Sequence, residues 1–422
     1  MIPSICPISF LKKGILYSCI LLSLPSCQTS DNIAYEGEDY FVKLYGGAGN
    51  QFASEVLETT SGNYLLVGSS NSQNGGSHMD FFLIMVDPAG NELWSSAYDF
   101  EGFDDEGLDV VEDDNGFLVT GTVEINGQGQ TKAGFLKVDN SGQEIWKTTI
   151  GRTAKSSETG RGIILLGDGS VIIAGETTDI DKFKYGQNGP SQDQEEVDTR
   201  DFYWIKLSLN QDTYTISWQK ALGSRGDDQV MDLLQTSTGG VRSISLLGQK
   251  ESSPGSENKD LYLFTVNENG NQTAVYESSL PQDVTAVEVA EDQNRGFVFM
   301  GNYREGSINK ILVQPLNEFL QKSSDHFIIE EGSLLGTSIQ SLGSEGYIIS
   351  GTMEGESKDV QLIKLDRSGS TLISRSYGDA EEDEGGGILP LDDGFLLNGT
   401  ISFGTNTMIT LIKTNSEGEL AP

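Results

Sequence analysis

The chain has 422 residues, with 27 Lys and Arg against 63 Asp and Glu, and a formal net charge of −36. This excess of negative charge repels phosphate backbones and anionic lipid head groups, which argues against nucleic acid as a partner. The 51 Gly, 18 Phe and 14 Tyr, against only 10 Pro, indicate many short strands joined by tight turns and argue against a disordered chain.

The first 26 residues have the pattern of an export signal. Lys12 and Lys13 precede an apolar run at 14–24 that is too short to span a bilayer. Cleavage after residue 26 removes Cys6 and Cys19 and leaves Cys27 alone, so no disulfide is expected. The body of the protein must then be stabilised by a sizeable apolar core.

The end of this segment, Leu-Pro-Ser-Cys at 24–27, resembles the lipobox of bacterial lipoproteins. The resemblance implies lipid attachment at Cys27, a polar tether at 27–38 and a location at the outer membrane, on its periplasmic or cell-surface side. Gln28, directly after this cysteine, resembles the residue at that position in lipoproteins that are sorted to the outer membrane. An ordinary signal for soluble secretion is the alternative.

One unit of about fifty residues recurs along 39–422. It contains a glycine turn, a short apolar run and a second glycine, and the seven copies are Gly62–Gly68, Gly116–Gly121, Gly169–Gly175, Gly240–Gly248, Gly296–Gly301, Gly346–Gly351 and Gly394–Gly399. A second apolar run, a turn that opens with Asp or Asn, and a third run follow in most copies. Together with the run before the glycine turn, these make four strands per unit.

Seven such units predict an all-β fold, a seven-bladed β-propeller of four-stranded antiparallel blades. The units are expected at 46–99, 100–150, 151–222, 223–280, 281–328, 329–377 and 378–420. The last unit ends before its fourth strand, and an extra strand stands at 40–45. We therefore expect this N-terminal strand to complete the last blade, which removes two exposed sheet edges.

Two family resemblances support this fold. The segments 86–94 and 138–146, a turn followed by Trp, look like the motif of quinoprotein dehydrogenase propellers, where it chiefly packs blades; the resemblance implies the fold and not the quinone cofactor. The mature chain also resembles the repeat lipoproteins of Bacteroidota, whose unit contains a lysine matched by Lys137, Lys206, Lys364 and Lys413. That resemblance implies location and architecture but no activity.

Antiparallel strands place the loops after the second and fourth strands on one face, which we call the loop face. This face receives the longest insertion, 181–201, with Phe183 and Tyr185 as candidate binding aromatics. It also receives pairs of acidic or amide residues in the connections between blades: Asn50-Gln51, Asp104-Asp105, Asp227-Asp228 and Glu382-Asp383. These pairs are candidate binding residues, for Ca²⁺ among others; alternatively they accept backbone N–H groups between blades.

Catalytic constellations are not recognisable in the sequence. His78 and His326 are the only histidines, too few for a His-based zinc site or a Ser/His/Asp triad. Paired carboxylates for glycoside hydrolysis cannot be picked out among 63 acidic residues without geometry. Apart from a possible Ca²⁺ ion, no metal or cofactor is predicted.

The sequence favours a non-enzymatic outer-membrane lipoprotein that serves as a protein-binding scaffold or accessory subunit of a larger envelope complex. Its expected partners are the membrane, through the lipid, and another outer-membrane or envelope protein bound at the loop face. Two alternatives remain open: a cell-surface glycan-binding propeller, and a propeller hydrolase that uses carboxylates of the loop face.

Overall fold

The computed structural model describes residues 40–420 except 73–74, 179–198, 211–212, 224–225, 239–240, 252–258, 279–283, 294–295 and 379. The chain divides into two compact units, Met1–Asn32 and Ile33–Pro422, and every described residue belongs to the second. Cys27 and the segment 27–38 lie outside the described residues. Within the described part there is no α-helix, and hence no helix of the length and apolarity that membrane crossing requires.

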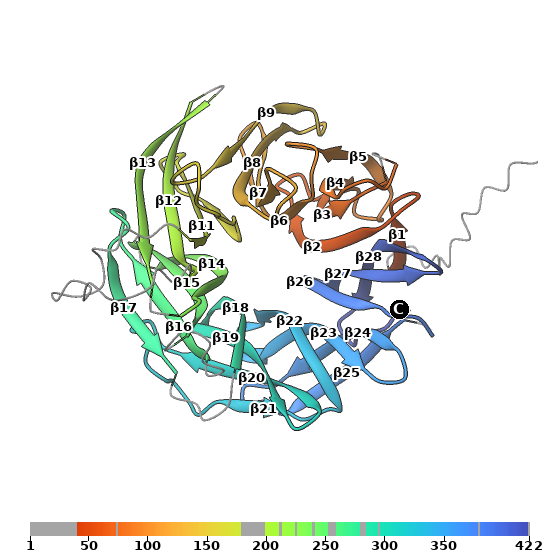
Figure 1. Cartoon of the computed structure of the whole chain (residues 1–422). Helices are drawn as coiled ribbons and strands as arrows, with labels where there is room; N and C mark the ends of the chain where they lie inside the picture. The colour runs from red at the N-terminus through yellow and green to blue at the C-terminus, as the bar shows by residue number, and fades with distance from the viewer. Residues whose placement is uncertain are drawn as a thin grey trace, which may run out of the picture. The chain divides into compact units, whose positions relative to one another are not determined.

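Seven four-stranded antiparallel sheets form a ring of blades, as predicted (Figure 1). The first three blades are β2 (Gln51–Glu58), β3 (Tyr64–Ser70), β4 (Asp80–Val86) and β5 (Glu92–Tyr98); β6 (Asp105–Asp113), β7 (Gly116–Glu124), β8 (Thr131–Asp139) and β9 (Glu144–Ile150); and β10 (Gly162–Leu165), β11 (Val171–Thr177), β12 (Asp201–Asn210) and β13 (Thr213–Leu222).

The next three blades are β14 (Gln229–Thr238), β15 (Val241–Glu251), β16 (Lys259–Val266) and β17 (Gln272–Glu277); β18 (Val284–Asp292), β19 (Gly296–Glu305), β20 (Ile308–Leu316) and β21 (Phe327–Ile329); and β22 (Ser333–Ser341), β23 (Tyr347–Glu354), β24 (Lys358–Leu365) and β25 (Thr371–Tyr377). The seventh contains β26 (Glu384–Leu391), β27 (Gly394–Phe403) and β28 (Asn406–Asn415). A short 3₁₀ turn, η2 (Gly343–Glu345), precedes β23.

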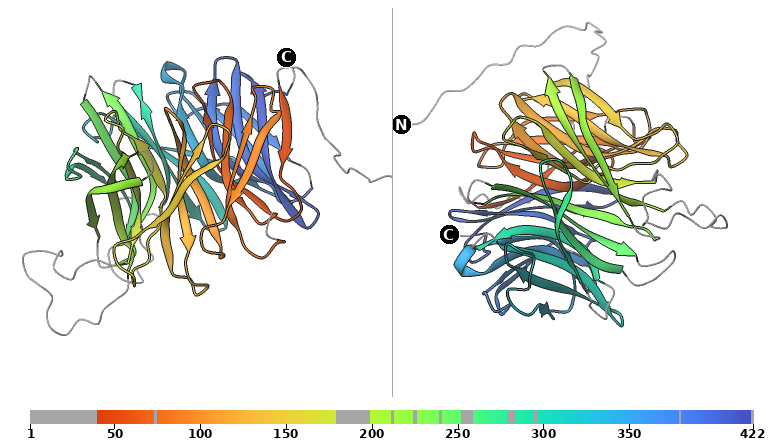
Figure 2. Two further views of the ribbon diagram at one scale, coloured as in Figure 1. Left: turned by 90° about the horizontal axis from the view of Figure 1, so that it is seen from above. Right: turned by 90° about the vertical axis from the view of Figure 1, so that its left-hand side faces the viewer.

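The N-terminal strand closes the ring. β1 (Phe41–Tyr45) runs antiparallel to β28, with Phe41 opposite Lys413 and Tyr45 opposite Ile409. In Figure 1 this red strand lies beside the dark-blue strands of the last blade, and Figure 2 shows the blades from above and from the side. The predicted completion of the last blade by the N-terminal strand is therefore confirmed.

The apolar core lies between neighbouring blades. The second and third strands carry it, because their side chains face the adjacent blades on both sides; every residue of β3 and β4 is buried. Phe81, with none of its side chain exposed, packs with Val119 and Leu136 of the next blade. Outer strands such as β5 are largely exposed or half-buried, so polar residues suit them.

The second glycine of each repeat has a steric cause. The first strand of most blades has a β-bulge, seen as a register shift between Gly107 and Asp109 in β6. The bulge turns the carbonyl of Glu106 toward Gly121, and a Cβ on Gly121 would overlap that oxygen. Gly68 faces the carbonyl of Phe52 in the same way. The repeat therefore keeps glycine where backbones approach closely.

Aromatic side chains of outer strands tie each blade to the next. Tyr98 donates its hydroxyl hydrogen to the carbonyl of Gly142, at 2.5 Å, and the Trp94 indole N–H donates to the carbonyl of Asn140, at 3.0 Å. Tyr45 makes the corresponding bond to Gly90 across the closing seam, at 2.7 Å. The turn-plus-Trp segments thus contribute to blade packing, which is the role that their resemblance implied.

Candidate functional site

The acidic pairs of the loop face lie at the corners between blades, where most of them accept hydrogen bonds from backbone N–H groups. Asp104 accepts the N–H of Met79 at 2.8 Å, and Asp227 accepts that of Arg200 at 2.9 Å. Asp383 accepts the N–H of Ser402 at 3.0 Å. These contacts are those of the backbone-capping alternative, and any ligand binding by the pairs stays a prediction.

The structure does not gather the pairs into one cluster. Asp105, Asp228 and Asp383 are buried, with 1%, 0% and 0% exposure, at three different corners of the ring. Glu382 is exposed, and its carboxylate lies 3.9 Å from Lys358 Nζ. Phe183 and Tyr185 lie outside the described residues.

A hollow of about 410 Å³ opens on the loop face between the first two blades. Its lining includes Asp104, Asp105 and the ring of Phe52, which is 43% exposed. This volume falls within the range of small-molecule sites. The predicted pair at 104–105 therefore lies beside this hollow.

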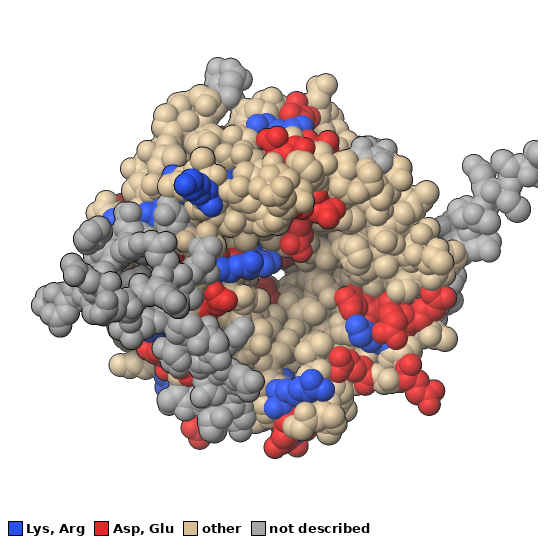
Figure 3. Space-filling view, viewed as in Figure 1, with Lys and Arg blue, Asp and Glu red and all other residues tan. Residues whose placement is uncertain are grey.

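Sequence reasoning missed a second group of acids, on the innermost strands. Glu55, Asp109, Asp232 and Glu288 occupy the same position after the bulge in four blades, opposite Val67, Thr120, Leu247 and Met300. We call them the channel carboxylates. The strands that carry them, β2, β6, β14 and β18, are the innermost of their blades (Figure 1), around the central hollow that Figure 3 shows.

Each channel carboxylate also accepts backbone hydrogen bonds. Asp109 accepts the N–H of Val110 in its own bulge and that of Ile163 in the next blade, both at 2.7 Å. Asp232 likewise accepts the N–H of Leu233, at 2.6 Å, and that of Val289 in the next blade, at 2.9 Å. Asp109 and Asp232 therefore connect neighbouring blades, whereas Glu55 accepts the N–H of Val56 in its own strand.

The environment raises the pKa of all four groups. Removal from bulk water raises the pKa of Glu55 to about 8, and the charges of Asp109 and Asp232 add to this. Desolvation likewise raises the pKa of Asp109 to about 7 and that of Asp232 to about 6, against the backbone bonds that lower both. The pKa of Glu288 is raised by burial and then by the charges of Asp232 and Glu55. Groups from four blades therefore interact through one central space.

A buried amide without a partner lies beside Glu55. Asn398 on β27 has no exposed surface, and neither its Oδ1 nor its Nδ2 has a hydrogen-bond partner among the described residues. A Cβ on Gly387 would lie 3.2 Å from Asn398 Oδ1 and 3.2 Å from Glu55 Oε1, so the two side chains meet at this glycine. Unsatisfied buried polar groups are rare in folded proteins and mark sites that a ligand or water completes.

The sequence does contain a weak signal for these residues. An acid followed by two apolar residues precedes the glycine turn at Glu55-Val-Leu, Asp109-Val-Val, Asp232-Leu-Leu and Glu288-Val-Ala. By simple strand alternation such an acid indicates a solvated face. Only the bulge, which shifts the register by one residue, turns it toward the channel.

Comparison with known proteins gives similarity of fold alone. No family model and no curated protein matches the chain. Among solved structures it is similar to a GH93 α-L-arabinofuranosidase of Fusarium graminearum, with 12% identity over 73% of this chain and 92% of that one and a TM-score of 0.48. It is similar to an α-L-arabinanase of Penicillium chrysogenum (13%, 73% and 92%, TM-score 0.47) and to a Dyadobacter fermentans protein of unknown function (10%, 79% and 96%, TM-score 0.47).

This comparison contradicts the prediction of a non-enzymatic scaffold, and with it the prediction that the chain is not an enzyme. The propellers found include an arabinofuranosidase and an arabinanase, which are hydrolases. The physical reason for the error is that a rigid ring of blades suits enzymes as well as scaffolds. A shortage of histidine excludes only histidine-dependent chemistry. At 10–13% identity the similarity assigns neither activity nor substrate to this chain.

Proposed function

We propose that the protein is a glycoside hydrolase whose acid and base are channel carboxylates. The observation that carries the proposal is that four acids occupy the same position after the bulge on the first strands of their blades, where burial raises their pKa values, to about 6 for Asp232 and about 8 for Glu55. At pH 7 one carboxyl group is then protonated while another is ionised. Two carboxyl groups held in opposite protonation states are the equipment of glycosidic bond hydrolysis.

In this proposal Glu55 is the general acid and Asp232 the general base. Glu55 donates its proton to the glycosidic oxygen as the bond to the anomeric carbon breaks. Asp232 takes a proton from the water whose oxygen attacks that carbon, so the products are a free sugar and an alcohol. The amide of Asn398, which has no hydrogen-bond partner among the described residues, lies beside Glu55 and would bind a sugar hydroxyl.

The remaining side chains favour acetal chemistry over ester or peptide hydrolysis. His78 lies between β3 and β4 and His326 lies just before the outer strand β21, whereas the channel carboxylates stand on the first strands of their blades. Cysteine occurs only at Cys6, Cys19 and Cys27. The described contact between a serine and a histidine, Ser77 with His78 at 2.9 Å, lies on the loop face and not at the channel carboxylates.

The proposal is tested by measuring the hydrolysis of aryl glycosides and of oligosaccharides, with furanosides and pyranosides of each kind. Glu55→Gln and Asp232→Asn are each expected to lower kcat by about 10²-fold or more. The amide oxygen still accepts the hydrogen bond from the backbone N–H, but the amide cannot donate or take up the catalytic proton. The wild-type rate is expected to be highest between pH 6 and 8, where Asp232 is ionised and Glu55 is protonated.

Glu58→Gln is the matched control, since Glu58 lies on the same strand and is exposed. Circular dichroism and thermal unfolding check that all variants fold. Turnover that both channel variants retain would contradict the assignment, and so would the lack of any turnover by the folded wild-type protein across the whole panel.

The address given by the N-terminus also remains a proposal: a bacterial outer-membrane lipoprotein of Bacteroidota type, anchored by a lipid on Cys27. It is supported by the Leu-Pro-Ser-Cys segment at 24–27 after the basic and apolar runs. In bacteria grown with labelled palmitate, the wild-type protein is expected to take up label and to sediment with outer membranes. Cys27→Ser is expected to lose both properties, and equal labelling of the two proteins would refute the anchor.

A further inference from the structure

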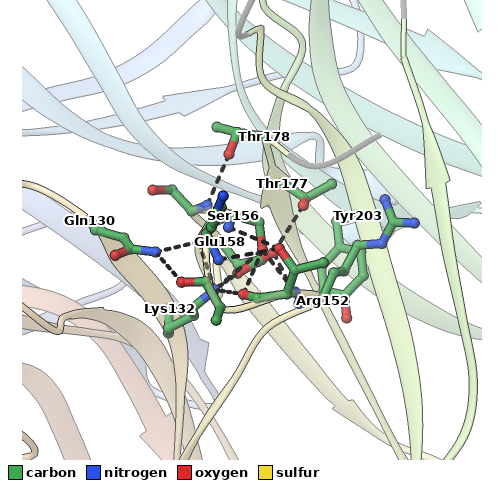
Figure 4. Close-up of polar contacts among 12 residues, drawn as sticks. Gln130, Lys132, Arg152, Ser156, Glu158, Thr177, Thr178 and Tyr203 are labelled. Atoms are coloured by element: carbon green, nitrogen blue, oxygen red, sulfur yellow. Dashed lines mark hydrogen bonds and ion pairs between the residues drawn. The ribbon is translucent and has the colours of Figure 1, made fainter. Parts of the chain in front are cut away.

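A buried lysine occupies the corner between the second and third blades. Lys132, with 6% exposure, lies 2.7 Å from Oε2 of Glu158, which is not exposed at all. Its ammonium also donates to the carbonyls of Thr153 and Ser156, at 2.7 and 2.6 Å. Figure 4 shows Lys132, Ser156 and Glu158 in this network. A cation surrounded by oxygen atoms therefore fastens the connection between these blades.

The corner between the first and second blades has the same backbone but different side chains. Glu158 donates its N–H to the carbonyl of Thr131, and Asp105 donates its N–H to that of Met79, at 3.0 and 2.7 Å. Asp80 and Asp105 thus stand where Lys132 and Glu158 stand in the second corner. The ammonium is replaced by a second carboxylate.

Both of these carboxylates are buried, with 1% exposure each. Asp105 Oδ1 has no hydrogen-bond partner among the described residues, although Oδ2 accepts the N–H of Phe100 at 2.9 Å. The corner between the first and second blades therefore holds two buried carboxyl groups where the second corner holds an ammonium group and a carboxylate.

Two further side chains complete the cluster on its exposed side. His78 Nε2 lies 3.3 Å from Asp80 Oδ1 and 3.8 Å from Asp99 Oδ1. One ligand atom from each of these residues lies within 4.8 Å of the others. Two ligands bound to one ion at about 2.1 Å are about 3.0–3.5 Å apart. Ser77 Oγ lies 2.9 Å from His78 Nδ1, the orienting contact typical of metal-binding imidazoles.

We propose that this corner binds a divalent ion of the Zn²⁺ or Mn²⁺ class, held by His78, Asp80 and Asp99 near the buried carboxyl group of Asp105. The ion takes the place that the Lys132 ammonium has in the second corner and fastens the first blade to the second. One imidazole with two carboxylates suits these ions better than Ca²⁺, which takes oxygen ligands alone. The site is structural, and it is separate from the channel carboxylates and from the proposed hydrolase activity.

The test measures thermal unfolding and titration calorimetry of EDTA-treated, dialysed full-length protein with ZnCl₂, MnCl₂ and CaCl₂. With Zn²⁺ or Mn²⁺ at about 100 times Kd, the wild-type Tm is expected to rise by about 3 °C. The third and sixth blades also carry Asp pairs at this position, Asp201 with Asp228 and Asp359 with Asp383. The decisive quantity is therefore the difference between variants and not the total metal bound.

Asp80→Lys is the most informative variant, because it rebuilds the Lys132–Glu158 arrangement. We expect the Tm of this variant to equal or exceed that of the metal-free wild type. We also expect the part of the Tm rise that comes from metal binding at this corner to disappear. His78→Gln is expected to weaken Zn²⁺ binding at least tenfold, whereas His326→Gln, which changes the only other histidine, leaves it unaltered. The proposal would be overturned if neither Zn²⁺ nor Mn²⁺ raised the Tm, or if Asp80→Lys and His78→Gln kept the full response to these ions. A rise in Tm with Ca²⁺ alone would overturn the proposed set of ligands.

Discussion

The free energy of unfolding is expected to fall as the pH rises from about 5 to about 8. The folded pKa values of Glu55, Asp109 and Asp232, about 8, 7 and 6, exceed ordinary values of 4.5 for Glu and 3.8 for Asp. In this interval the folded protein binds more protons than the unfolded chain. The resulting stabilisation is complete below the ordinary pKa and is lost as the pH passes the folded pKa.

The size of this effect follows from the same shifts. One pKa unit corresponds to about 1.4 kcal/mol. Because Glu55, Asp109 and Asp232 are only half-buried, solvent screens part of this energy, and each group contributes on the order of 2 kcal/mol. Urea unfolding at pH 5, 6, 7 and 8, with EDTA present throughout, measures the slope. We expect the highest urea midpoint at pH 5 and the lowest at pH 8.

Glu55→Gln isolates the contribution of one channel carboxyl. The variant cannot ionise at this position, so its stability is expected to depend less steeply on pH than that of the wild type. Glu58→Gln, on the same strand but exposed, is expected to keep the wild-type slope. Stability that rises between pH 6 and 8, or equal slopes in the two variants, would show that the channel carboxyls do not have raised pKa values.

Removal of the N-terminal strand is expected to destabilise the ring by about 5 kcal/mol or more. A chain that begins at Gly47 lacks Phe41 and Tyr45, which are 4% and 5% exposed, and leaves the edge of β28 unpaired. The loss of each buried aromatic side chain costs about 3 kcal/mol or more, and the free edge invites association with other chains. Thermal unfolding and size-exclusion chromatography measure the two effects.

A chain that begins at Tyr40 is the control, since it keeps β1 and lacks only the preceding residues. It is expected to unfold at the wild-type temperature and to elute as the wild type does. Tyr45→Phe removes only the hydrogen bond to Gly90 and is expected to cost about 1 kcal/mol. If the chains that begin at Tyr40 and Gly47 had equal unfolding midpoints, β1 would not be a structural part of the last blade.

The repeat made the fold predictable, because each blade has the same pattern of apolar runs and glycine turns. Glycine turns before Tyr64, Phe117 and Phe395 mark the same strand in different units, and the missing strand of the last unit appears at the other end of the chain. Seven consistent copies outweigh the ambiguity of any single short strand.

The site was less predictable, for reasons of register and of distance. Glu55 and Asp232 are 177 positions apart in the sequence, and a bulge in each strand decides which way they point. Asp104 and Asp105 look equivalent as neighbours in sequence, yet Asp104 is exposed while Asp105 is buried. The acidic residues of the loop face could be predicted from the sequence, but which of them are buried and which groups they contact could not.

The pairing of Phe41 with Lys413 also sets the order in which the molecule can mature. During synthesis the first strand must wait, without its partner, until nearly the whole chain has emerged. The nascent protein is then an open arc of complete blades with two unsatisfied ends, and the final step joins residues from its two extremities. Such a late, long-range junction makes the closing reaction slow compared with the formation of individual blades, and it exposes the arc to chaperones and proteases until then.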